Sequence, residues 1–167
     1  MISVENGSPV SFLIDFGLAR QYRDPATFRH ASYKPNEEVV GTLMFSSIMG
    51  QQGATQSRRD DLESLAYTII YSARGELPWT GCRNPKTVLA KKLGTPFNEL
   101  CEGLPKHFCD FLLHVRQLGF EEKPDYQHLH SILTRCLENE TDQPIEAPPS
   151  VHVPVGIQRT PVVCDRM

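Results

Sequence analysis

The sequence lacks the features that mark membrane, secreted and nucleic-acid-binding proteins. It has no run of about 18 apolar residues that could span a membrane, and its first residues lack the basic and apolar regions of a signal peptide. Lysine and arginine number 17 against 20 aspartate and glutamate, so a net charge of -3 gives no broad electrostatic footprint. We therefore expect a cytoplasmic or nuclear protein that binds neither nucleic acid nor a membrane.

The cysteines do not form the pattern of a disulfide framework. They are an odd, scattered set without a C-x-x-C pair: Cys82, Cys101, Cys109, Cys136 and Cys164. Such a set is typical of reduced thiols in a reducing compartment. Internal repeats are also lacking, and 167 residues with 40% apolar content suit one globular unit of ordinary size.

The first third of the chain contains a predicted hairpin and a long irregular segment. Asn6-Gly7 is a strong two-residue turn signal between strands expected at residues 1–4 and 10–14. Residues 15–56 then show no sustained period, because proline and glycine interrupt a polar stretch. An irregular stretch of this length is longer than an ordinary connection, which indicates a functional segment.

Residues 57–137 carry helical patterns and form the predicted core. Ser57 and Asp60 resemble a capping box at the start of a central helix, and Gly75 is expected to end it. The apolar residues of this helix are so numerous that we expect burial on most sides: Leu62, Leu65, Ala66, Tyr67, Ile69, Ile70, Tyr71 and Ala73. Proline at the first helical position predicts short helices over about 85–93 and 96–102.

Two further helices complete a mainly α fold with a short β-hairpin and about five helices. One opens at Pro105 and the other is capped by Asp125. Their apolar stripes are Phe108, Phe111, Leu112 and Val115 in the first, and Leu129, Ile132, Leu133, Cys136 and Leu137 in the second. Residues 138–167 contain repeated prolines and no amphipathic period, so we predict a disordered tail.

The candidate chemistry begins at Asp15-Phe16-Gly17, which directly follows the apolar run 10–14. In a protein kinase this position holds the aspartate that binds magnesium on ATP. The three-letter match alone is weak, because an aspartate and a glycine after a strand are more often an ordinary turn. Further motifs decide between the two interpretations.

Those motifs resemble the casein kinase I family of serine/threonine protein kinases in their order and spacing. They are Asp15-Phe16-Gly17-Leu18-Ala19-Arg20, Tyr22-Arg23-Asp24-Pro25, Gly41-Thr42, Ser47-Ile48, Ser57-Arg58-Arg59-Asp60-Asp61-Leu62-Glu63-Ser64-Leu65, Leu77-Pro78-Trp79 and Lys123-Pro124-Asp125-Tyr126. Ser47-Ile48 stands where most protein kinases carry A-P-E, a peculiarity of this family. The resemblance covers residues 1–137 and implies a kinase-like C-terminal lobe without its N-lobe, in which 15–56 is the activation segment and 57–137 the helical core.

The resemblance also implies roles for individual residues. Asp15, Phe16 and Gly17 would be the cofactor-binding residues. Asp15 would hold magnesium, Phe16 would pack beneath the αC helix, and Gly17 would permit the backbone turn that aims the carboxylate. Thr42 would hydrogen-bond the catalytic loop and help to place the substrate hydroxyl, although from the residues alone an ordinary turn threonine is an equal alternative. Asp61 would be the buried carboxylate of the central helix that accepts amide hydrogen bonds from the catalytic loop.

Three positions remain to be interpreted. Arg58 and Arg59 could bind substrate as cations, but on a helix they more plausibly form local ion pairs or support the activation segment. Met44 stands where the family has an arginine that binds phosphate, and methionine cannot supply charged donors. This departure counts against phosphate-primed recognition.

The chain contains no Gly-rich phosphate loop, strand lysine or H-R-D loop. A complete kinase of this kind would use ATP and Mg²⁺ to phosphorylate hydroxyls of a protein substrate, and we expect this chain alone to be inactive. The alternatives are a non-catalytic, pseudokinase-like module that binds a protein partner, and the product of an incomplete gene model. The sequence does not indicate an oligomeric state.

Overall fold

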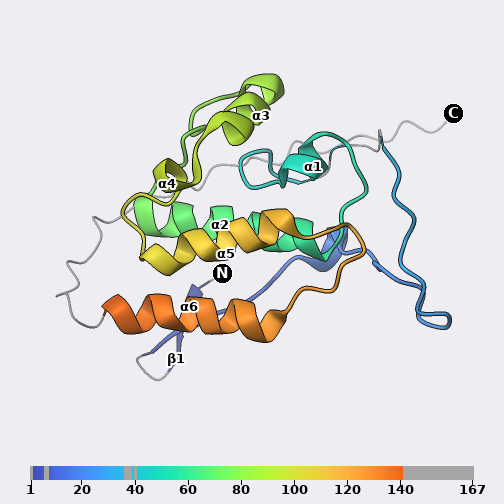
Figure 1. The fold of residues 1–167 in the computed structure, drawn as a ribbon, viewed down its shortest axis with the longest axis horizontal. Coiled ribbons are helices and arrows are strands. Elements are labelled where there is room, and N and C mark those ends of the chain that lie inside the picture. The colour runs from blue at the N-terminus through green and yellow to red at the C-terminus, as the bar shows by residue number, and fades with distance from the viewer. Residues whose placement is uncertain (1, 6–7, 36–38, 40, 141–167) are drawn as a thin grey trace, which may run out of the picture.

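The computed structural model describes residues 2–5, 8–35, 39 and 41–140, and this part of the chain is mainly helical (Figure 1). Helices α2, α5 and α6 lie side by side, because α5 packs on both α2 and α6, while α4 packs on α5 and α1 packs on α2 and α3. The elements in chain order are β1 (Ile2–Glu5), β2 (Ser8–Ser11), the 3-10 turn η1 (Phe16–Leu18), α1 (Ile48–Gln51), α2 (Arg58–Arg74), α3 (Pro85–Gly94), α4 (Phe97–Leu100), α5 (Lys106–Gln117) and α6 (Tyr126–Glu140).

The predicted hairpin is confirmed, with a shorter second strand. β1 and β2 pair antiparallel, with Ile2 opposite Ser11 and Glu5 opposite Ser8. The predicted turn Asn6-Gly7 lies outside the described residues. The second strand was expected to continue through residue 14, but it stops at Ser11, and Leu13 beyond it is 83% exposed. No other described strand pairs with this hairpin, so nothing extends the ladder past residue 11.

The central helix α2 begins and ends where the sequence predicts. At its start the Asp60 carboxylate accepts the Ser57 backbone N–H at 2.8 Å, which satisfies a donor that has no partner inside the helix. At its end Gly75 adopts the left-handed conformation with φ 78°, and its N–H donates to the Tyr71 carbonyl at 2.8 Å.

The prediction that α2 is buried on most sides is wrong. Ala66, Tyr67 and Ile70 are fully buried, but Leu65 is 43% exposed and Ala73 is exposed. The reason is that α5 and α1 pack on one face of α2, while the face that carries Leu65 is not covered within the described part of the chain. The apolar periodicity therefore located the helix correctly and overestimated how much of it is enclosed.

The caps predicted for α3 and α6 are confirmed, whereas α4 spans only Phe97–Leu100 and has Pro96 as its N-cap and not at its first helical position. Asn84 accepts the N–H of Lys86 at 2.9 Å before α3, and Asp125 accepts that of His128 at 2.9 Å before α6. The four apolar residues predicted for α5 are all buried. Helix α6 continues to Glu140, so residues 138–140, predicted as the start of the tail, are helical, and Leu137 is 68% exposed.

One contiguous core joins these helices. Its buried members come from the helices and from the loop before α3: Ala66, Tyr67, Ile70, Leu77, Trp79, Val88, Leu100, Cys101, Phe108, Phe111, Leu112, Val115, Leu129, Ile132 and Cys136. Trp79 is only 1% exposed, which confirms its prediction as a core residue. Among the helices described, none is long and apolar enough to cross a membrane.

Candidate functional site

Asp15, Phe16 and Gly17 form one exposed turn. Asp15 adopts a left-handed conformation with φ 64° and ψ 69°, and its Oδ1 accepts the Gly17 N–H at 3.4 Å. A Cβ at Gly17 would lie 3.3 Å from that oxygen, so any larger residue would crowd the carboxylate. Phe16 is 67% exposed. The sequence thus brings these three residues together on the surface, where Asp15 remains accessible.

This turn offers one carboxylate, that of Asp15, and not a set of metal ligands. Within residues 2–5, 8–35, 39 and 41–140, no three His, Cys, Asp or Glu side chains are grouped so as to hold a metal ion. Magnesium bound to nucleotide usually takes one or two protein carboxylates, with phosphate oxygens and water completing an octahedral shell. The Asp15 carboxylate therefore fits one position in such a shell.

The loop of residues 42–46, hereafter the anchored loop, is held by two buried side chains. The Lys92 ammonium donates to the Leu43 carbonyl at 2.8 Å and to the Ser46 carbonyl at 2.6 Å. The Trp79 indole N–H donates to the Met44 carbonyl at 2.8 Å. Three backbone carbonyls of the loop are fixed in this way, while Thr42 at its start is exposed. The loop thus presents Thr42 to solvent from a fixed backbone.

Lys92 is a supporting residue of the anchored loop that the sequence did not reveal. It is completely buried, and its ammonium also lies 5.3 Å and 5.4 Å from the ring centroids of Tyr67 and Trp79. Lys92 lies four residues after the buried Val88, so both residues share one face of α3. This spacing was the signal in the sequence that could have indicated the burial of Lys92. The donors of Lys92 are consumed by the anchored loop.

A buried ionic network continues from Lys92 into the core. The Glu63 carboxylate accepts the Tyr67 hydroxyl at 2.5 Å and the Arg116 Nε at 3.3 Å, and Arg116 also donates to the Tyr67 oxygen at 2.7 Å. The second Glu63 oxygen accepts the Ile48 backbone N–H at 3.3 Å. Burial, with help from Glu63, raises the pKa of Tyr67. The network connects α1, α2 and α5.

The structure confirms Asp60 in the capping box at the start of α2 but does not bury Asp61. Asp60 is 1% exposed and its carboxylate accepts the Ser47 hydroxyl at 2.7 Å as well as the Ser57 N–H. Asp61, predicted as the buried carboxylate, is exposed. Partial burial of its carboxyl, together with the charge of Asp60, raises the Asp61 pKa. The hydrogen bonds from Ser47 and Ser57 account for the enclosure of Asp60 rather than Asp61.

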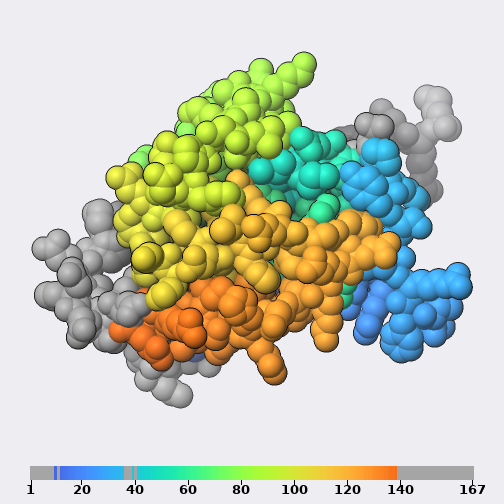
Figure 2. Space-filling model, viewed as in Figure 1, coloured from blue at the N-terminus to red at the C-terminus, as the bar shows by residue number. Residues whose placement is uncertain are grey.

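Arg58 contacts both the irregular segment and the loop after α5, and Arg59 contacts the loop after α5. Arg58 donates to the Glu121 carbonyl at 2.8 Å and its guanidinium lies 4.4 Å from the Tyr22 ring centroid. Arg59 donates to the Leu118 carbonyl at 3.1 Å. Both arginines thereby connect α2 to the loop after α5, and the blue segment in Figure 2 lies at this end of the molecule.

Aromatic contacts attach the same segment to Phe120. The ring centroid of Phe120 lies 4.8 Å from that of His30 and 5.2 Å from that of Tyr33, in edge-on arrangements. His30 also pairs with Arg23 in an isolated antiparallel bridge. Residues 22–33 are therefore attached to the helical core through the loop that follows α5.

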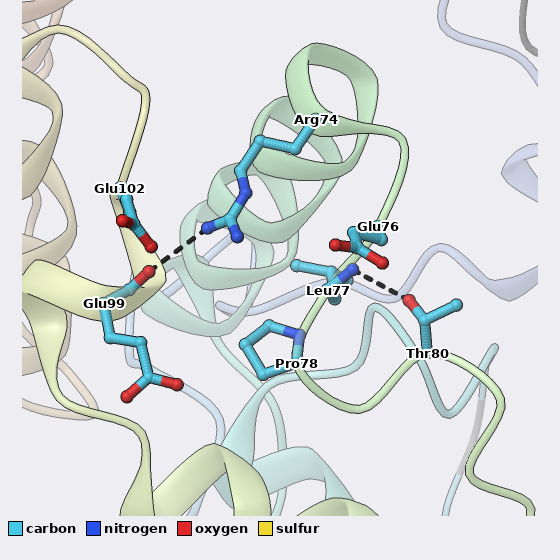
Figure 3. A pocket seen from close by; sticks show the side chains of 7 residues that line it. All are labelled: Arg74, Glu76, Leu77, Pro78, Thr80, Glu99 and Glu102. Atoms are coloured by element: carbon cyan, nitrogen blue, oxygen red, sulfur yellow. Dashed lines mark hydrogen bonds between the residues drawn. The ribbon is translucent and has the colours of Figure 1, made fainter.

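A shallow depression of about 350 Å³ lies elsewhere on the surface (Figure 3). Its lining residues are Arg74, Glu76, Leu77, Pro78, Thr80, Glu99 and Glu102. Figure 3 shows the Arg74 guanidinium directed at the Glu99 carbonyl, to which it donates at 3.1 Å. None of the residues predicted as functional lines this depression, so it does not coincide with the candidate site.

Titration of Lys92 gives a testable signature of its burial. Burial lowers the pKa of Lys92 from 10.5 to about 8, because desolvation disfavours the ammonium more than Glu63 favours it. Between these two values the unfolded chain keeps a proton that the folded chain has lost, so the free energy of unfolding rises with pH. We expect the lowered pKa of Lys92 to contribute on the order of 3 kcal/mol to the free energy of unfolding at high pH. This contribution should be lost as the pH falls through about 8.

Urea unfolding of the wild type and of Lys92→Met at several pH values measures this contribution. The difference between the two proteins isolates Lys92, since the raised pKa of Cys101 shifts stability in the opposite direction in both. Lys91→Met is the matched control, because Lys91 is exposed and donates only to the Pro78 carbonyl. Equal pH slopes in the wild type and Lys92→Met would contradict a lysine with a lowered pKa.

Comparison with known proteins adds one line of evidence to this geometry. No protein-family model matches the chain. A curated protein of Schizosaccharomyces pombe (strain 972 / ATCC 24843), Casein kinase I homolog 3, is 43% identical over 141 residues, which is 80% of this chain and 32% of that protein. The chain thus spans about a third of the length of this relative.

Proposed function

Because the chain is casein kinase I-like over 80% of its length, we propose that it forms the substrate-positioning lobe of a serine/threonine protein kinase. In a complete kinase domain this lobe would serve transfer of the ATP γ-phosphoryl to a hydroxyl of a protein substrate. The observation that carries the proposal is the anchored loop, which Lys92 and Trp79 hold at three carbonyls. A fixed loop suits a reaction in which positioning supplies much of the catalysis.

Specific residues receive roles under this proposal. Asp15 would supply a carboxylate to hold Mg²⁺ on ATP, and the ion would provide neutralisation of charge on the phosphoryl group. Thr42, exposed at the start of the anchored loop, hydrogen-bonds the catalytic loop and helps to place the substrate hydroxyl. Residues 15–56 serve as the activation segment. Arg58 supports it through the Tyr22 ring, 4.4 Å from its guanidinium, and Arg59 supports the adjoining loop through the Leu118 carbonyl.

The chain by itself does not catalyse the reaction under this proposal. It supplies neither a lysine on the phosphates nor a catalytic-loop aspartate, so charge stabilisation and proton acceptance are incomplete. The Asp15 turn is also exposed and offers one carboxylate. We place the protein in the cytoplasm or nucleus, with a protein substrate and no nucleic-acid or membrane ligand.

A non-catalytic interaction module is the second candidate function. The observation that favours it is the exposure of apolar side chains near the Asp15 turn, with Leu13 at 83%, Phe16 at 67% and Leu18 at 65%. Apolar residues gathered on a surface in this way mark places where another protein surface docks. Under this alternative Asp15 has no role in the chemistry.

A chimera distinguishes the two functions. The region of the S. pombe relative that precedes its matched segment is fused to residues 1–140 of this chain, and transfer of phosphate from ATP to casein is measured. Under the proposal the chimera phosphorylates casein, and Asp15→Ala lowers the rate at least a hundredfold, or about 3 kcal/mol in transition-state stabilisation. The unfused chain serves as the inactive reference.

The control variant is Asp24→Ala, which changes an exposed aspartate whose carboxylate caps its own turn by accepting the N–H groups of Ala26 and Thr27. It is expected to leave the rate within a few-fold. A folded chimera without activity would favour the non-catalytic module. Activity that survives Asp15→Ala would remove Asp15 from the metal site.

A further inference from the structure

Two histidine rings from consecutive helices meet on the helical core. His114 lies on α5 and His128 on α6, and the two helices pack side by side (Figure 1). The ring centroids of the two histidines are 5.3 Å apart, with 61° between the ring planes. Each helix carries one more histidine, His107 on α5 and His130 on α6, and neither takes part in this contact. The fold thus selects one imidazole from each helix and brings the two together.

Ring nitrogens of this pair are available to a ligand. His114 is half-buried, and its Nε2 is buried without a hydrogen-bond partner among the residues that the structure describes. His128 is exposed, and its hydrogen bonds are made by its backbone, whose N–H donates to Asp125 Oδ1 at 2.9 Å and whose carbonyl accepts the Ser131 hydroxyl at 2.7 Å. A buried polar atom without a partner costs free energy, and a bond to a ligand would remove that cost.

The spacing of the two rings fits one metal ion between them. Imidazole is the commonest metal ligand among protein side chains. With Zn–N bonds of about 2.0 Å and tetrahedral angles, two imidazoles on one Zn²⁺ have ring centroids about 5.2 Å apart. The observed 5.3 Å agrees with that value. Edge-to-face packing without a metal gives a similar spacing, so the unpaired Nε2 of His114 is the observation that favours a ligand.

We propose that His114 and His128 form a Zn²⁺ site that joins α5 to α6. A lone pair from each ring displaces one water molecule from hydrated Zn²⁺, so two Zn–N bonds form and no electron is transferred. The exposed side chain of His128 is free to turn a ring nitrogen toward the ion. Water fills the other positions, because in the described part of the chain no third His, Cys, Asp or Glu is grouped with the pair.

Two consequences follow from a site of this kind. Binding is reversible and weaker than at structural zinc sites, which have four protein ligands. Binding also stabilises the folded chain, because the two ligands belong to different helices and separate when the chain unfolds. The melting temperature should therefore rise with the concentration of Zn²⁺.

Zinc titration of the full chain tests the site, with the histidine ring signals in NMR spectra and calorimetry as the two measurements. The expected result is saturable binding of one Zn²⁺ by this pair, with the ring signals of His114 and His128 shifting together. His128→Ala should weaken the binding at least tenfold and abolish the shift of the His114 ring. This substitution removes an exposed side chain, so the fold is expected to remain.

His130→Ala is the matched control, because His130 is exposed on the same helix and lies outside the ring contact. Its affinity for Zn²⁺ should stay within twofold of the wild type. His114→Gln tests the second ligand and should also bind at least tenfold more weakly, and His128→Ala decides the matter if His114→Gln does not fold. Zinc held by cysteine thiols would leave both rings unshifted and would persist in His128→Ala. That result, or the lack of saturable binding in the wild type, overturns the proposal.

Discussion

Glu63→Gln is expected to lower the free energy of unfolding by about 3 to 5 kcal/mol, the usual cost of removing one partner from a buried ion pair. Glu63 is 7% exposed, and its carboxylate accepts hydrogen bonds from Tyr67, Arg116 and the Ile48 backbone. Glutamine keeps the shape but removes the charge that compensates Arg116 and the nearby ammonium of Lys92. Urea denaturation followed by circular dichroism measures the loss.

A double-mutant cycle separates the ion pair from general damage. If the charge of Arg116 left without a partner causes the loss, Arg116→Met in the Glu63→Gln background should cost much less than it does alone. Glu76→Gln is the matched control, since this carboxylate is exposed, and a change within about 0.5 kcal/mol is expected. Strict additivity of the two changes, or an equal loss in Glu76→Gln, would contradict the buried pair.

Local signals predicted the helices well, because caps are short-range chemistry. Ser57 with Asp60, Asn84 and Asp125 each mark a helix start that the structure confirms, and Gly75 ends α2 with a positive φ. Each of these residues satisfies backbone groups within four positions of itself. The signals for helix starts and ends are therefore present in the sequence even when the fold is unknown.

Long-range side-chain contacts could not be predicted in the same way. Lys92 has the charge of a surface residue, and only the fold brings it to the carbonyls of Leu43 and Ser46, more than forty positions earlier. The choice between Asp60 and Asp61 has a similar cause. Either carboxylate favours the first turn of a helix, and contact with Ser47 encloses Asp60.

The same distinction between local and long-range contacts applies to the candidate site. The placement of Asp15, Phe16 and Gly17 on one turn follows from adjacent residues, so the sequence predicted it. The anchoring of the loop that begins at Thr42 depends on α3 and on Trp79, and no pattern near Thr42 indicates it. Supporting residues of a site are therefore harder to predict than the residues that act in it.

Ile70→Asp is expected to abolish cooperative unfolding, whereas Leu65→Asp should not. Ile70 is fully buried in the core, and an unpaired carboxylate there costs several kcal/mol beyond the lost packing, more than about 4 kcal/mol in total. The apolar pattern of the sequence had predicted that Leu65 is buried. In the structure Ile70, and not Leu65, is the position of α2 at which a charge should unfold the core. Leu65→Asp should change the free energy of unfolding by about 1 kcal/mol or less.

The pair of variants also tests which face of α2 is enclosed. Both substitutions introduce the same charge into one helix at positions with comparable helix propensity, so a difference between them arises from tertiary contacts. Circular dichroism with limited proteolysis distinguishes the cases: Ile70→Asp should lose helical signal and be cleaved throughout 57–137, while Leu65→Asp keeps both properties of the wild type. Unfolding by Leu65→Asp as severe as by Ile70→Asp would mean that another surface covers that face in solution. Since Leu65 is 43% exposed, that surface would lie outside the described residues.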